Sequence, residues 1–400
     1  MRFAFVFDGL GCGGIERVGV DYCNALIECG HEVTVINLVP SMDEFARQLS
    51  TNIKYIPMKF SRHIAPERYC SLISRAAWGR FVYPLVYLAT SLVVVAKRLC
   101  LRNKLGSFDV AIAFSGHFND LTFVSFGCAS AEKKLAWIHG TINSYALISD
   151  GYVNLYKHFD KLVCLSDEGI EEFRDAKHWL DLPLVKIHNP IDLCRHGDDG
   201  EIKNKLRESY GDYILMVARL APPKDPETLI DAVAILREKY GIEKKCVIVG
   251  DGPDMEKVSK SIAGSSVPDL VHLVGYENNP VPYYQACEVF VLSSLNEGLP
   301  TVLLEAMAWG KPVVSTNVPG AREILEGGKD GLLCRIKDPE DMAKCLAFLY
   351  SDSTAMTQYS ELALSRVQSF SKHKIMDQFL RCIVEGGPDE FILREFSNEP

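Results

Sequence analysis

Glu297 and Glu305 bracket the stretch NEGLPTVLLE (296–305). Two carboxylates this close in the chain suit a catalytic acid/base pair or a metal site, or they are unrelated surface groups. The strand-like run EVFVLSS (288–294) precedes them, and Pro300 suits the first turn of a helix, TVLLEAMAWG. We therefore expect Glu297 in a loop above a sheet and Glu305 on the helix. Nothing in the sequence places the two carboxylates close enough for a metal ion or an acid/base dyad.

Arg219 and Lys224 supply positive charge to a second loop, ARLAPPKDPETLIDA. Arg219 is expected to end the strand-like run YILMVAR, and Lys224 to lie just before a helix whose cap is Asp225. Two cations at the carboxyl end of a strand can neutralise a diphosphate without a metal ion. The alternative is that both are solvated surface charges, although the paired prolines stiffen the loop and favour a functional role.

A glycine-rich loop, GLGCGGIER (9–17), follows the first strand-like run. Gly9, Gly11 and Gly14 spell GxGxxG ahead of a helix, and backbone N–H groups at a helix N-terminus bind phosphate. A nicotinamide-binding fold also needs an acid at the end of its second strand, but the first acid after EVTVINL (32–38) is Asp43. This counts against a nicotinamide oxidoreductase, and a tight turn between strand and helix remains the structural alternative.

Apolar strand-like runs alternate with helix-like segments along most of the chain, which indicates parallel sheets covered on both faces. The first set of runs is FAFVF (3–7), EVTVINL (32–38), DVAIAF (109–114), KKLAWIH (133–139) and KLVCLS (161–166). The second set is YILMVAR (213–219), CVIVG (246–250), LVHLVG (270–275), EVFVLSS (288–294) and PVVST (312–316). The fold class is therefore α/β, with two doubly wound Rossmann-like domains facing a cleft. Ligands of such sheets bind at the carboxyl ends of the strands, where the loops above lie.

The domain boundary is expected within the polar, turn-rich stretch HNPIDLCRHGDDGEIKNK. It separates an N-terminal domain, 1–195, from a C-terminal domain, 196–370. Residues 371–400 are expected to form a C-terminal helix and a polar tail that can cross back to the N-terminal domain.

Overall composition excludes several classes of protein. The net charge of −9 argues against a general nucleic-acid binder. The 13 cysteines are scattered without a CxxC pair or zinc-site spacing, so we expect reduced thiols in a cytoplasmic compartment and no metal site. The N-terminus, MRFAFVFDGLG, does not resemble a signal peptide and is expected to form the first strand.

Positive charge concentrates in residues 51–104. This segment holds ten basic residues and one acidic residue, a formal charge of +9, around the uncharged run FVYPLVYLATSLVVVA (81–96). The run of sixteen residues is shorter than the roughly 20 that a spanning helix needs. It is expected to be a buried helix of the N-terminal domain, or a helix lying on an anionic membrane surface with Arg and Lys beside it.

Together these features resemble the family-four retaining glycosyltransferases of the GT-B fold, most specifically over residues 213–335. Glu297 and Glu305 match that family's E-x7-E motif, and Arg219 and Lys224 match its R…K pair. VGDGP (249–253) also fits the family pattern. The remaining matches are Gly13, Gly14 and Glu16 in GGxE; HNPID (188–192), with Pro190 in place of the family's glycine; and His139 in LAWIHG, with His117 as a second candidate for the active-site histidine.

The resemblance implies a role for each matched residue. Arg219 and Lys224 would hold the donor diphosphate, Glu305 the ribose and Glu297 the donor sugar. His139 would orient the sugar or the acceptor, its alternative being a hydrogen-bonded core histidine. The implied catalytic residues are His139, Glu297, Arg219 and Lys224. The implied donor-binding residues are Gly13, Gly14, Glu16, Arg219, Lys224, Gly298, Leu299, Thr301, Val302 and Glu305.

The implied activity is transfer of a hexosyl or N-acetylhexosaminyl group, with retention, from a nucleotide-sugar donor, most often a UDP-sugar. The N-terminal domain would receive a glycan acceptor, lipid-linked or of the lipopolysaccharide or capsule type. No cofactor, metal or nucleic acid is expected. The implied location is cytoplasmic and peripheral at the inner face of the plasma membrane, through segment 51–104. A sugar-nucleotide epimerase of the same fold and a non-catalytic nucleotide-sugar-binding subunit are the alternatives.

Overall fold

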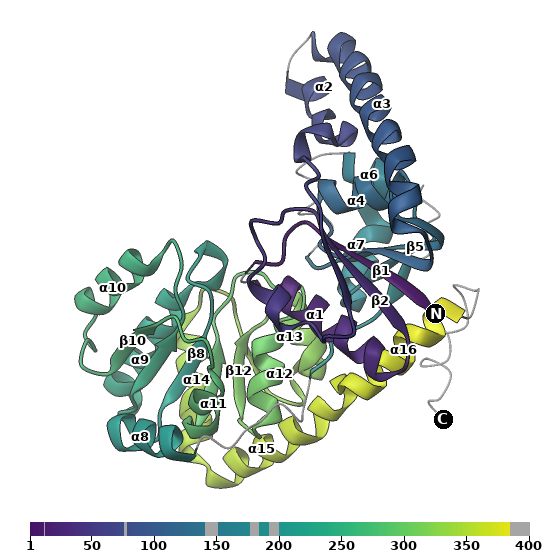
Figure 1. The fold of residues 1–400 in the computed structure, drawn as a ribbon. Coiled ribbons are helices and arrows are strands. Elements are labelled where there is room, and N and C mark those ends of the chain that lie inside the picture. The colour runs from purple at the N-terminus through teal and green to yellow at the C-terminus, as the bar shows by residue number, and fades with distance from the viewer. Residues whose placement is uncertain (12, 76–77, 141–150, 177–183, 192–199, 385–400) are drawn as a thin grey trace. The chain divides into compact units, whose positions relative to one another are not determined.

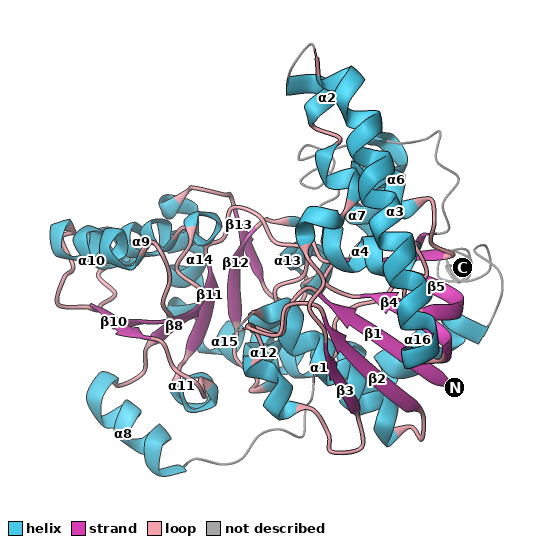
Figure 2. Ribbon diagram, turned by 45° about the horizontal axis from the view of Figure 1, so that its top comes forward, coloured by secondary structure: helices cyan, strands magenta, loops and turns pink. Residues whose placement is uncertain are grey.

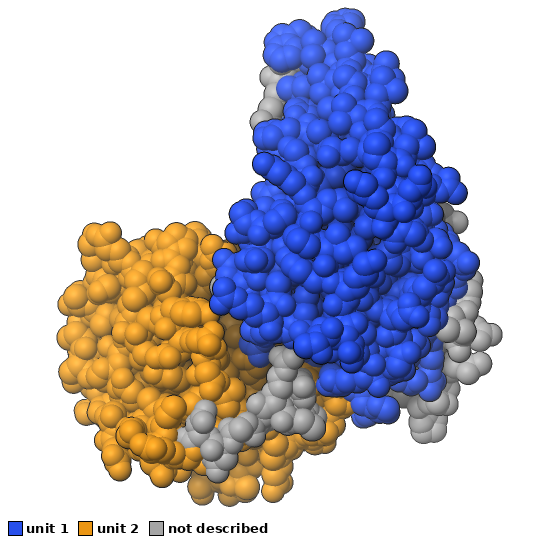
Figure 3. Space-filling model, viewed as in Figure 1, with its two compact units in different colours: residues 1–190, 372–400 blue, residues 191–371 orange. Residues whose placement is uncertain are grey.

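The computed structural model describes residues 1–11, 13–75, 78–140, 151–176, 184–191 and 200–384 (Figure 1). The chain divides into two compact units, unit 1 with residues 1–190 and 372–400, and unit 2 with residues 191–371 (Figure 3). The division falls five residues before the boundary expected after residue 195. Residue 192 of the HNPID stretch and residues 385–400 of the expected tail lie outside the described residues.

Unit 1 contains a seven-stranded parallel sheet in the order β3-β2-β1-β4-β5-β6-β7. Its strands are β1 (Arg2–Phe7), β2 (Glu32–Asn37), β3 (Lys54–Pro57), β4 (Ser107–Ala113), β5 (Ser130–Ile138), β6 (Lys161–Cys164) and β7 (Leu184–Lys186). Its helices are α1 (Gly14–Glu28), α2 (Leu72–Arg75), α3 (Gly79–Leu105), α4 (Phe118–Ser125), α6 (Gly151–Tyr156), α7 (Asp167–Ala176) and α16 (Lys372–Val384). Short 3-10 turns, η2 (Arg62–Ile64) and η3 (Pro66–Tyr69), precede α2.

Unit 2 contains a six-stranded parallel sheet in the order β10-β9-β8-β11-β12-β13. Its strands are β8 (Ile214–Val217), β9 (Cys246–Val249), β10 (Val271–Gly275), β11 (Val289–Leu292), β12 (Val313–Thr316) and β13 (Leu332–Cys334). Its helices are α8 (Gly200–Tyr210), α9 (Pro226–Tyr240), α10 (Met255–Gly264), α11 (Val281–Ala286), α12 (Thr301–Ala308), α13 (Pro319–Ile324), α14 (Pro339–Ser351) and α15 (Ser353–Val367).

Both sheets have helices interleaved between their parallel strands, which confirms the predicted α/β class and the two doubly wound domains (Figure 2). The apolar runs form strands because parallel strands are buried on both faces. Phe3, Phe5 and Phe7 of β1, for example, are all fully buried. The cysteines at the described positions are free thiols, as expected.

The C-terminal helix α16 returns to unit 1 after the chain has completed unit 2. Its Phe379 ring packs against the rings of Phe3, Tyr22 and Trp137, with ring centroids 6.1, 5.7 and 5.7 Å away. Lys372, at the start of the helix, forms an ion pair with Glu28 at the end of α1. The helix is therefore part of the unit 1 core.

The uncharged run 81–96 lies within α3, whose 27 residues extend past it at both ends. In the described part of the chain, α3 is the one helix long and apolar enough to cross a membrane by length and composition. Only 6% of its most apolar window is buried. The expectation of a helix buried in the N-terminal domain is therefore wrong, because most of this apolar surface faces outward.

Candidate active site

In unit 2 the loops that follow β8 and β11 lie together at the carboxyl edge of the sheet, because these two strands are neighbours. The backbone N–H of Leu295 donates to the carbonyl of Pro223 at 2.7 Å. The hydroxyl of Ser293 donates to the carbonyl of Lys224 at 3.0 Å. These bonds hold the cation-bearing loop against the loop that carries Glu297.

Lys224 and Glu297 form a direct ion pair between Nζ and Oε1. The hydroxyl of Ser294 donates to the same carboxylate oxygen at 2.8 Å. The side chains of Lys224 and Glu297 are 26% and 13% exposed, so a ligand can reach both. The structure thus brings together two of the residues that the sequence analysis assigned to the donor.

Arg219 lies two residues beyond the end of β8 at Val217, so the expectation that it ends the strand is wrong. Its side chain is exposed and makes no hydrogen bond or ion pair with any residue in the described part of the chain. Beyond β8, the N–H of Ala218 donates to the carbonyl of Val249 at the end of β9, and the N–H of Leu220 donates to the carbonyl of Asp251 in the loop that follows.

The turn between Lys224 and α9 has a left-handed residue at Asp225, with φ of 44°. Asp225 lies at the expected cap position, but its side chain makes no hydrogen bond to the helix backbone. Its carboxylate instead accepts the hydroxyl of Thr228 at 2.6 Å. A non-glycine residue in this conformation is strained, and such strain gathers at ligand-binding turns.

The VGDGP stretch packs against the backbone of the Arg219 loop. Gly250 has φ of +145°, and a Cβ atom there would lie 1.8 Å from the carbonyl oxygen of Ala218. The N–H of Leu220 donates to the carbonyl of Asp251 at 2.9 Å, and the N–H of Asp254 donates to the carbonyl of Leu220 at 3.0 Å. Glycine at position 250 therefore lets two loops of the sheet edge meet closely enough to fix the path of the chain around Arg219.

Helix α12 begins at Thr301, and Pro300 occupies the cap position before it rather than the expected first turn. No side chain caps this end of the helix, so its first N–H groups can meet an anion. Thr301 and Val302 are half-buried, and Glu305 is buried on the helix. Gly298 and Leu299 lie in the preceding loop, which the N–H of Gly320 holds by donating to the carbonyl of Glu297 at 3.1 Å.

In unit 1 the predicted phosphate loop begins α1, with Gly13 at the cap and Gly14 as the first helical residue. A Cβ atom on Gly13 would lie 2.2 Å from Oε2 of Glu16, whereas a Cβ atom on Gly14 would meet nothing within 4 Å. The carboxylate of Glu16 therefore covers Gly13, next to the place predicted for a phosphate.

His139 follows β5, and its Nε2 donates to the carbonyl of Phe114 at 2.6 Å. The two rings also pack, with centroids 4.9 Å apart. Burial lowers the pKa of His139 to about 4, although its bond to Phe114 opposes the shift. The imidazole is therefore neutral near pH 7, and its proposed catalytic role stays a prediction.

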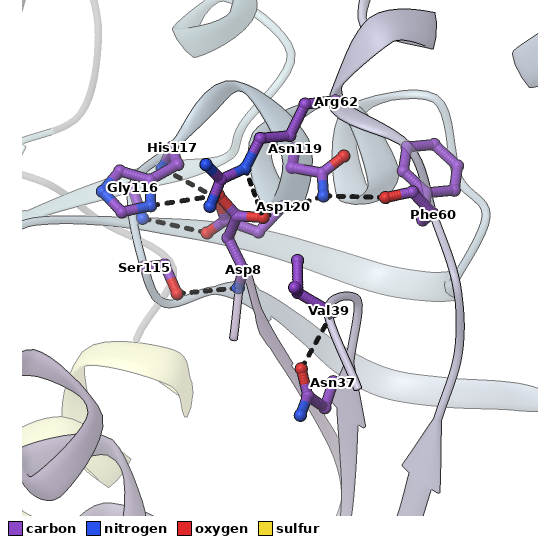
Figure 4. Close-up of polar contacts among 10 residues, drawn as sticks. All are labelled: Asp8, Asn37, Val39, Phe60, Arg62, Ser115, Gly116, His117, Asn119 and Asp120. Atoms are coloured by element: carbon purple, nitrogen blue, oxygen red, sulfur yellow. Dashed lines mark hydrogen bonds and ion pairs between the residues drawn. The ribbon is translucent and has the colours of Figure 1, made fainter. Parts of the chain in front are cut away.

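A buried cluster around Asp8 was missed by the sequence analysis, apart from His117 (Figure 4). Asp8 follows β1, and its carboxylate accepts Nδ2 of Asn119 at 2.8 Å. Nη2 of Arg62 lies 3.0 Å and Nδ1 of His117 3.2 Å from the other carboxylate oxygen. The available signal was Asp8 at the end of one strand and the run SGHFND after another, which becomes useful only once β1 and β4 are known to be neighbours.

The charges of this cluster support one another. Burial raises the pKa of Asp8, but the hydrogen bonds from His117 and Asn119 and the charge of Arg62 outweigh it, so the net pKa is lowered. The hydrogen bond to Asp8 raises the pKa of His117. Asp120 lies beneath, accepting the N–H groups of Gly116 and His117 at 2.9 and 2.8 Å, and burial raises its pKa to about 7.

The residues described contain no group of three or more His, Cys, Asp or Glu side chains that could hold a metal ion. The ion pair of Glu297 with Lys224 and the hydrogen-bonded turn at Asp225 use carboxylates that a metal would otherwise need. The described residues of the candidate site supply two cations, Lys224 in an ion pair and Arg219 exposed, together with carboxylates and the N-terminus of α12.

Comparison with known proteins agrees with this arrangement. Residues 198–366 match the family described as glycosyl transferases group 1. An uncharacterized glycosyltransferase of Haemophilus influenzae is 25% identical over 379 residues, which cover 94% of this chain and 97% of that protein. The N-acetylgalactosamine-N,N'-diacetylbacillosaminyl-diphospho-undecaprenol 4-alpha-N-acetylgalactosaminyltransferase of Campylobacter jejuni is 31% identical over 199 residues, covering 50% of this chain and 53% of that enzyme.

Among solved structures, HepE of Anabaena in complex with UDP has a TM-score of 0.73 and 19% sequence identity, covering 96% of this chain and 99% of its own. At this identity the likeness establishes the fold. Residues 198–366, which make up most of unit 2, match the group 1 glycosyl transferases, and with the named relatives this match identifies the chain as a glycosyltransferase with the GT-B fold.

Proposed function

We propose that this enzyme transfers a sugar, with retention of configuration, from a nucleotide sugar to a glycan acceptor linked to lipid. The observation that carries the proposal is the meeting of Lys224 and Glu297 at the edge of the unit 2 sheet, in the loop that leads into helix α12. The family match covers this region. HepE was crystallised with UDP and with UDP-glucose, which favours UDP as the nucleotide.

The chemistry follows from charge. Breaking the bond between sugar and diphosphate puts negative charge on the diphosphate and positive character on the sugar. Lys224 and the first N–H groups of α12 would stabilise the leaving diphosphate as preorganised donors, and the exposed Arg219 would add positive charge once the ligand binds. No metal ion is then needed, and a phosphate oxygen can take the proton of the acceptor.

The carboxylates would bind the two ends of the donor. Glu305 would accept hydrogen bonds from the ribose, and Glu297 would accept them from the sugar. Binding would then exchange the ion pair between Lys224 and Glu297 for contacts with the diphosphate and with sugar hydroxyls. In unit 1, Gly13, Gly14 and Glu16 at the start of α1 are also proposed to contact the donor.

The acceptor is proposed to be membrane-linked because of helix α3. Its outer face carries Phe81, Leu85, Leu88, Leu92 and Leu99, which are between 59% and 74% exposed. With Val95, which is 41% exposed, these residues recur every three or four positions and form one apolar stripe along the helix. Exposed patches of this kind mark interaction with a protein or a membrane.

The inner face of α3 contacts unit 1 through both apolar and polar side chains. Val94 and Leu105 are buried in the core of the unit, and the hydroxyl of Tyr83 donates to the buried carboxylate of Glu67 at 3.0 Å. The exposed leucines and Phe81 are therefore additional to the apolar surface that α3 uses within its own unit.

Exposed cations stand at both ends of the stripe. Arg80 lies at its start, and Arg98, Arg102 and Lys104 lie at its end. Basic side chains beside an apolar face favour the headgroup region of an anionic bilayer over a neutral protein partner. We therefore infer a cytoplasmic enzyme held peripherally on an anionic membrane by α3. The Campylobacter relative, whose name includes diphospho-undecaprenol, supports a lipid-linked acceptor.

A thermal-shift screen of sugar nucleotides tests the donor site. A ligand at a hundred times its Kd stabilises the folded protein by about 2.7 kcal/mol, and Lys224→Ala should remove the shift. An absence of stabilisation by every sugar nucleotide would contradict the proposed donor site. Product analysis then separates the alternatives, because a transferase forms a glycoside and an epimerase a rearranged sugar nucleotide.

Vesicle flotation tests the membrane surface. The protein should float with vesicles of phosphatidylcholine and phosphatidylglycerol, and replacing Leu85, Leu88 and Leu92 with serine should leave it in the soluble fraction. In a matched control variant, serine replaces Ile336, Phe348 and Leu364, which are exposed apolar residues of unit 2. This variant should still float with the vesicles. If the wild-type protein does not bind these vesicles, the membrane proposal is wrong and the transferase proposal is unaffected.

A further inference from the structure

His117 uses only one of its two ring nitrogens within the described structure. Nδ1 lies 3.2 Å from Oδ2 of Asp8, and Nε2 makes no hydrogen bond with any of the described residues. The side chain of His117 is 42% exposed, although the carboxylate that it contacts is buried. An imidazole held in this way has a fixed orientation and one nitrogen available to a ligand.

The carboxylate of Asp8 is unusually well fixed, with a side chain only 2% exposed. Nδ2 of Asn119 donates to it at 2.8 Å, and Arg62 contacts both of its oxygens, at 3.0 Å from Nη2 and 3.4 Å from Nε. The N–H of Asp8 itself donates to the hydroxyl of Ser115 at 2.9 Å. The charge of Arg62 offsets that of Asp8, so the buried carboxylate needs no proton from His117.

His117 is also fixed from its backbone. Its N–H donates to Asp120, and the preceding Gly116 has a left-handed φ of +67°. A Cβ atom on Gly116 would lie 2.7 Å from the carbonyl oxygen of Trp137 on the neighbouring strand. The turn after β4 therefore cannot shift easily, and the ring is set from both ends.

A second polar atom of the cluster has no partner. Oδ1 of Asn119 is buried and accepts no hydrogen bond from the described residues, although its Nδ2 bonds both to Asp8 and to the carbonyl of Phe60. Buried polar atoms are nearly always paired. Two acceptor atoms of the cluster therefore have no partner among the described residues: Oδ1 of Asn119, which is buried, and, in the tautomer with hydrogen on Nδ1, Nε2 of His117, whose side chain is exposed enough to meet a ligand.

We propose that Asp8 is a positioning residue, which fixes the imidazole of His117 so that Nε2 accepts a hydrogen bond from a hydroxyl group of a bound sugar. The proposal rests on the glycosyltransferase function proposed above. The cluster follows β1 and β4 at the carboxyl edge of the unit 1 sheet, where ligands of such folds bind. The sugar is that of the donor or that of the acceptor, since both present hydroxyl groups.

Ligand binding to the Asp8→Asn variant distinguishes a positioning role of Asp8 from a general loss of protein structure. The probes are UDP and the tightest-binding of four UDP-hexoses, namely UDP-glucose, UDP-galactose, UDP-N-acetylglucosamine and UDP-N-acetylgalactosamine. If the sugar is that of the donor, the variant should bind the UDP-hexose about tenfold or more weakly than the wild-type protein does, a loss typical of one hydrogen bond to a charge-supported group. Its affinity for UDP should equal that of the wild-type protein. In the acceptor case both affinities stay unchanged and the KM for the acceptor rises by the same factor.

Asp109→Asn is the matched control, because Asp109 is a carboxylate of the same sheet that pairs with Arg2. It should change none of these values. If Asp8→Asn yields no folded protein, His117→Gln removes the ring at a 42% exposed position and should give the same selective loss. An equal loss of UDP and UDP-hexose affinity, or no loss of either affinity together with an unchanged acceptor KM, would overturn the proposal.

A ligand-free measurement keeps this test apart from the test of the proposed function. Nitrogen-15 NMR of the histidine side chains should find His117 with hydrogen on Nδ1 in the wild-type protein, and Asp8→Asn should change its tautomer balance and lower its pKa. If the His117 signal does not respond to Asp8→Asn, the positioning role is wrong whichever sugar nucleotides bind. If it responds but no sugar nucleotide binds, the donor function fails instead.

Discussion

At the carboxyl edge of each sheet, a loop carries a carboxylate beside basic side chains. The two carboxylates, Glu297 and Asp8, are held in different ways. Glu297 of unit 2 is 13% exposed and bonds to Lys224 and Ser294. Asp8 of unit 1 is 2% exposed and is held by Asn119, Arg62 and His117. One carboxylate can exchange its partners for a ligand, whereas the other is fixed by more partners than one ligand could replace.

This difference helps to distinguish a carboxylate that contacts the ligand from a carboxylate that orients another side chain. The side chains of Lys224 and Glu297 are 26% and 13% exposed, so solvent can replace their ion pair at little cost to the fold. Asp8 and Asn119 are buried, so removing either one leaves a buried polar group of the other without its bond, whereas Arg62 and His117 are 50% and 42% exposed. Substitutions in unit 2 should therefore act mainly on transfer, and those around Asp8 on stability as well.

The largest expected effect is on transfer by Lys224→Ala. Loss of one preorganised cation at the leaving diphosphate should lower the transfer rate by about 10²–10³, while the free energy of unfolding changes by less than about 1 kcal/mol. Rates come from product formation with saturating donor, and stability from urea unfolding.

Lys257→Ala is the control for Lys224, because Lys257 also pairs with a glutamate, Glu227, at the surface of unit 2. It should leave both values unchanged. If the Lys224→Ala protein transfers sugar at the wild-type rate, the donor diphosphate does not bind at this edge of the sheet.

The next largest effect is on stability, by Asp8→Ala. The amide of Asn119 is fully buried and would lose its carboxylate partner, which should cost about 1–3 kcal/mol. Differential scanning calorimetry of the whole chain measures the loss. Glu297→Ala should lower stability less, and the opposite order would show that Asp8 is not the more firmly held of the two carboxylates.

Most of the fold could be predicted from the sequence, because long apolar strands and helix-like segments have a strong pattern. Strands β3, β7 and β13 were not predicted, since each has only three or four residues and a mixed burial pattern. The outward apolar face of α3 could not be separated from a buried one, because its inner face is uncharged too.

The candidate site was predictable in unit 2 and largely not in unit 1. Lys224 and Glu297 follow strongly apolar strands, so the βα-loop rule located both, although the motifs paired Lys224 with Arg219 and Glu297 with Glu305 rather than with each other. Asp8 comes from the loop after β1, Arg62 from the turn η2 and Asn119 from helix α4, and their meeting depends on the order of strands in the sheet, which the sequence does not specify. Asp8 also directly precedes the glycine-rich loop, and the functional interpretation of this region was based on Gly13 and Gly14 instead.

The smallest expected effect is a pH dependence of stability that belongs to the Asp8 cluster alone. The pKa of His117 is raised in the folded protein by its bond to Asp8, so protonation favours the folded state. Its stabilisation should be complete below the ordinary histidine pKa of about 6.5 and should disappear as pH rises through the folded pKa. The groups that face the ring are Asp8, Asp120 and Arg62, and Asp120 titrates in the same range, with a pKa of about 7.

The measurement compares thermal unfolding of the wild-type protein and His117→Gln from pH 5.5 to 8.5. The wild-type advantage should be greatest at the acidic end, within about 1 kcal/mol because the ring is partly exposed, and should shrink as pH rises. Lys224→Ala in unit 2 leaves the Asp8 cluster intact, so its stability difference from the wild-type protein should not follow this trend with pH. An advantage that grows with pH would mean that Asp8 does not hold His117 in its protonated form, and the contrast between the two carboxylates would then lie in burial alone.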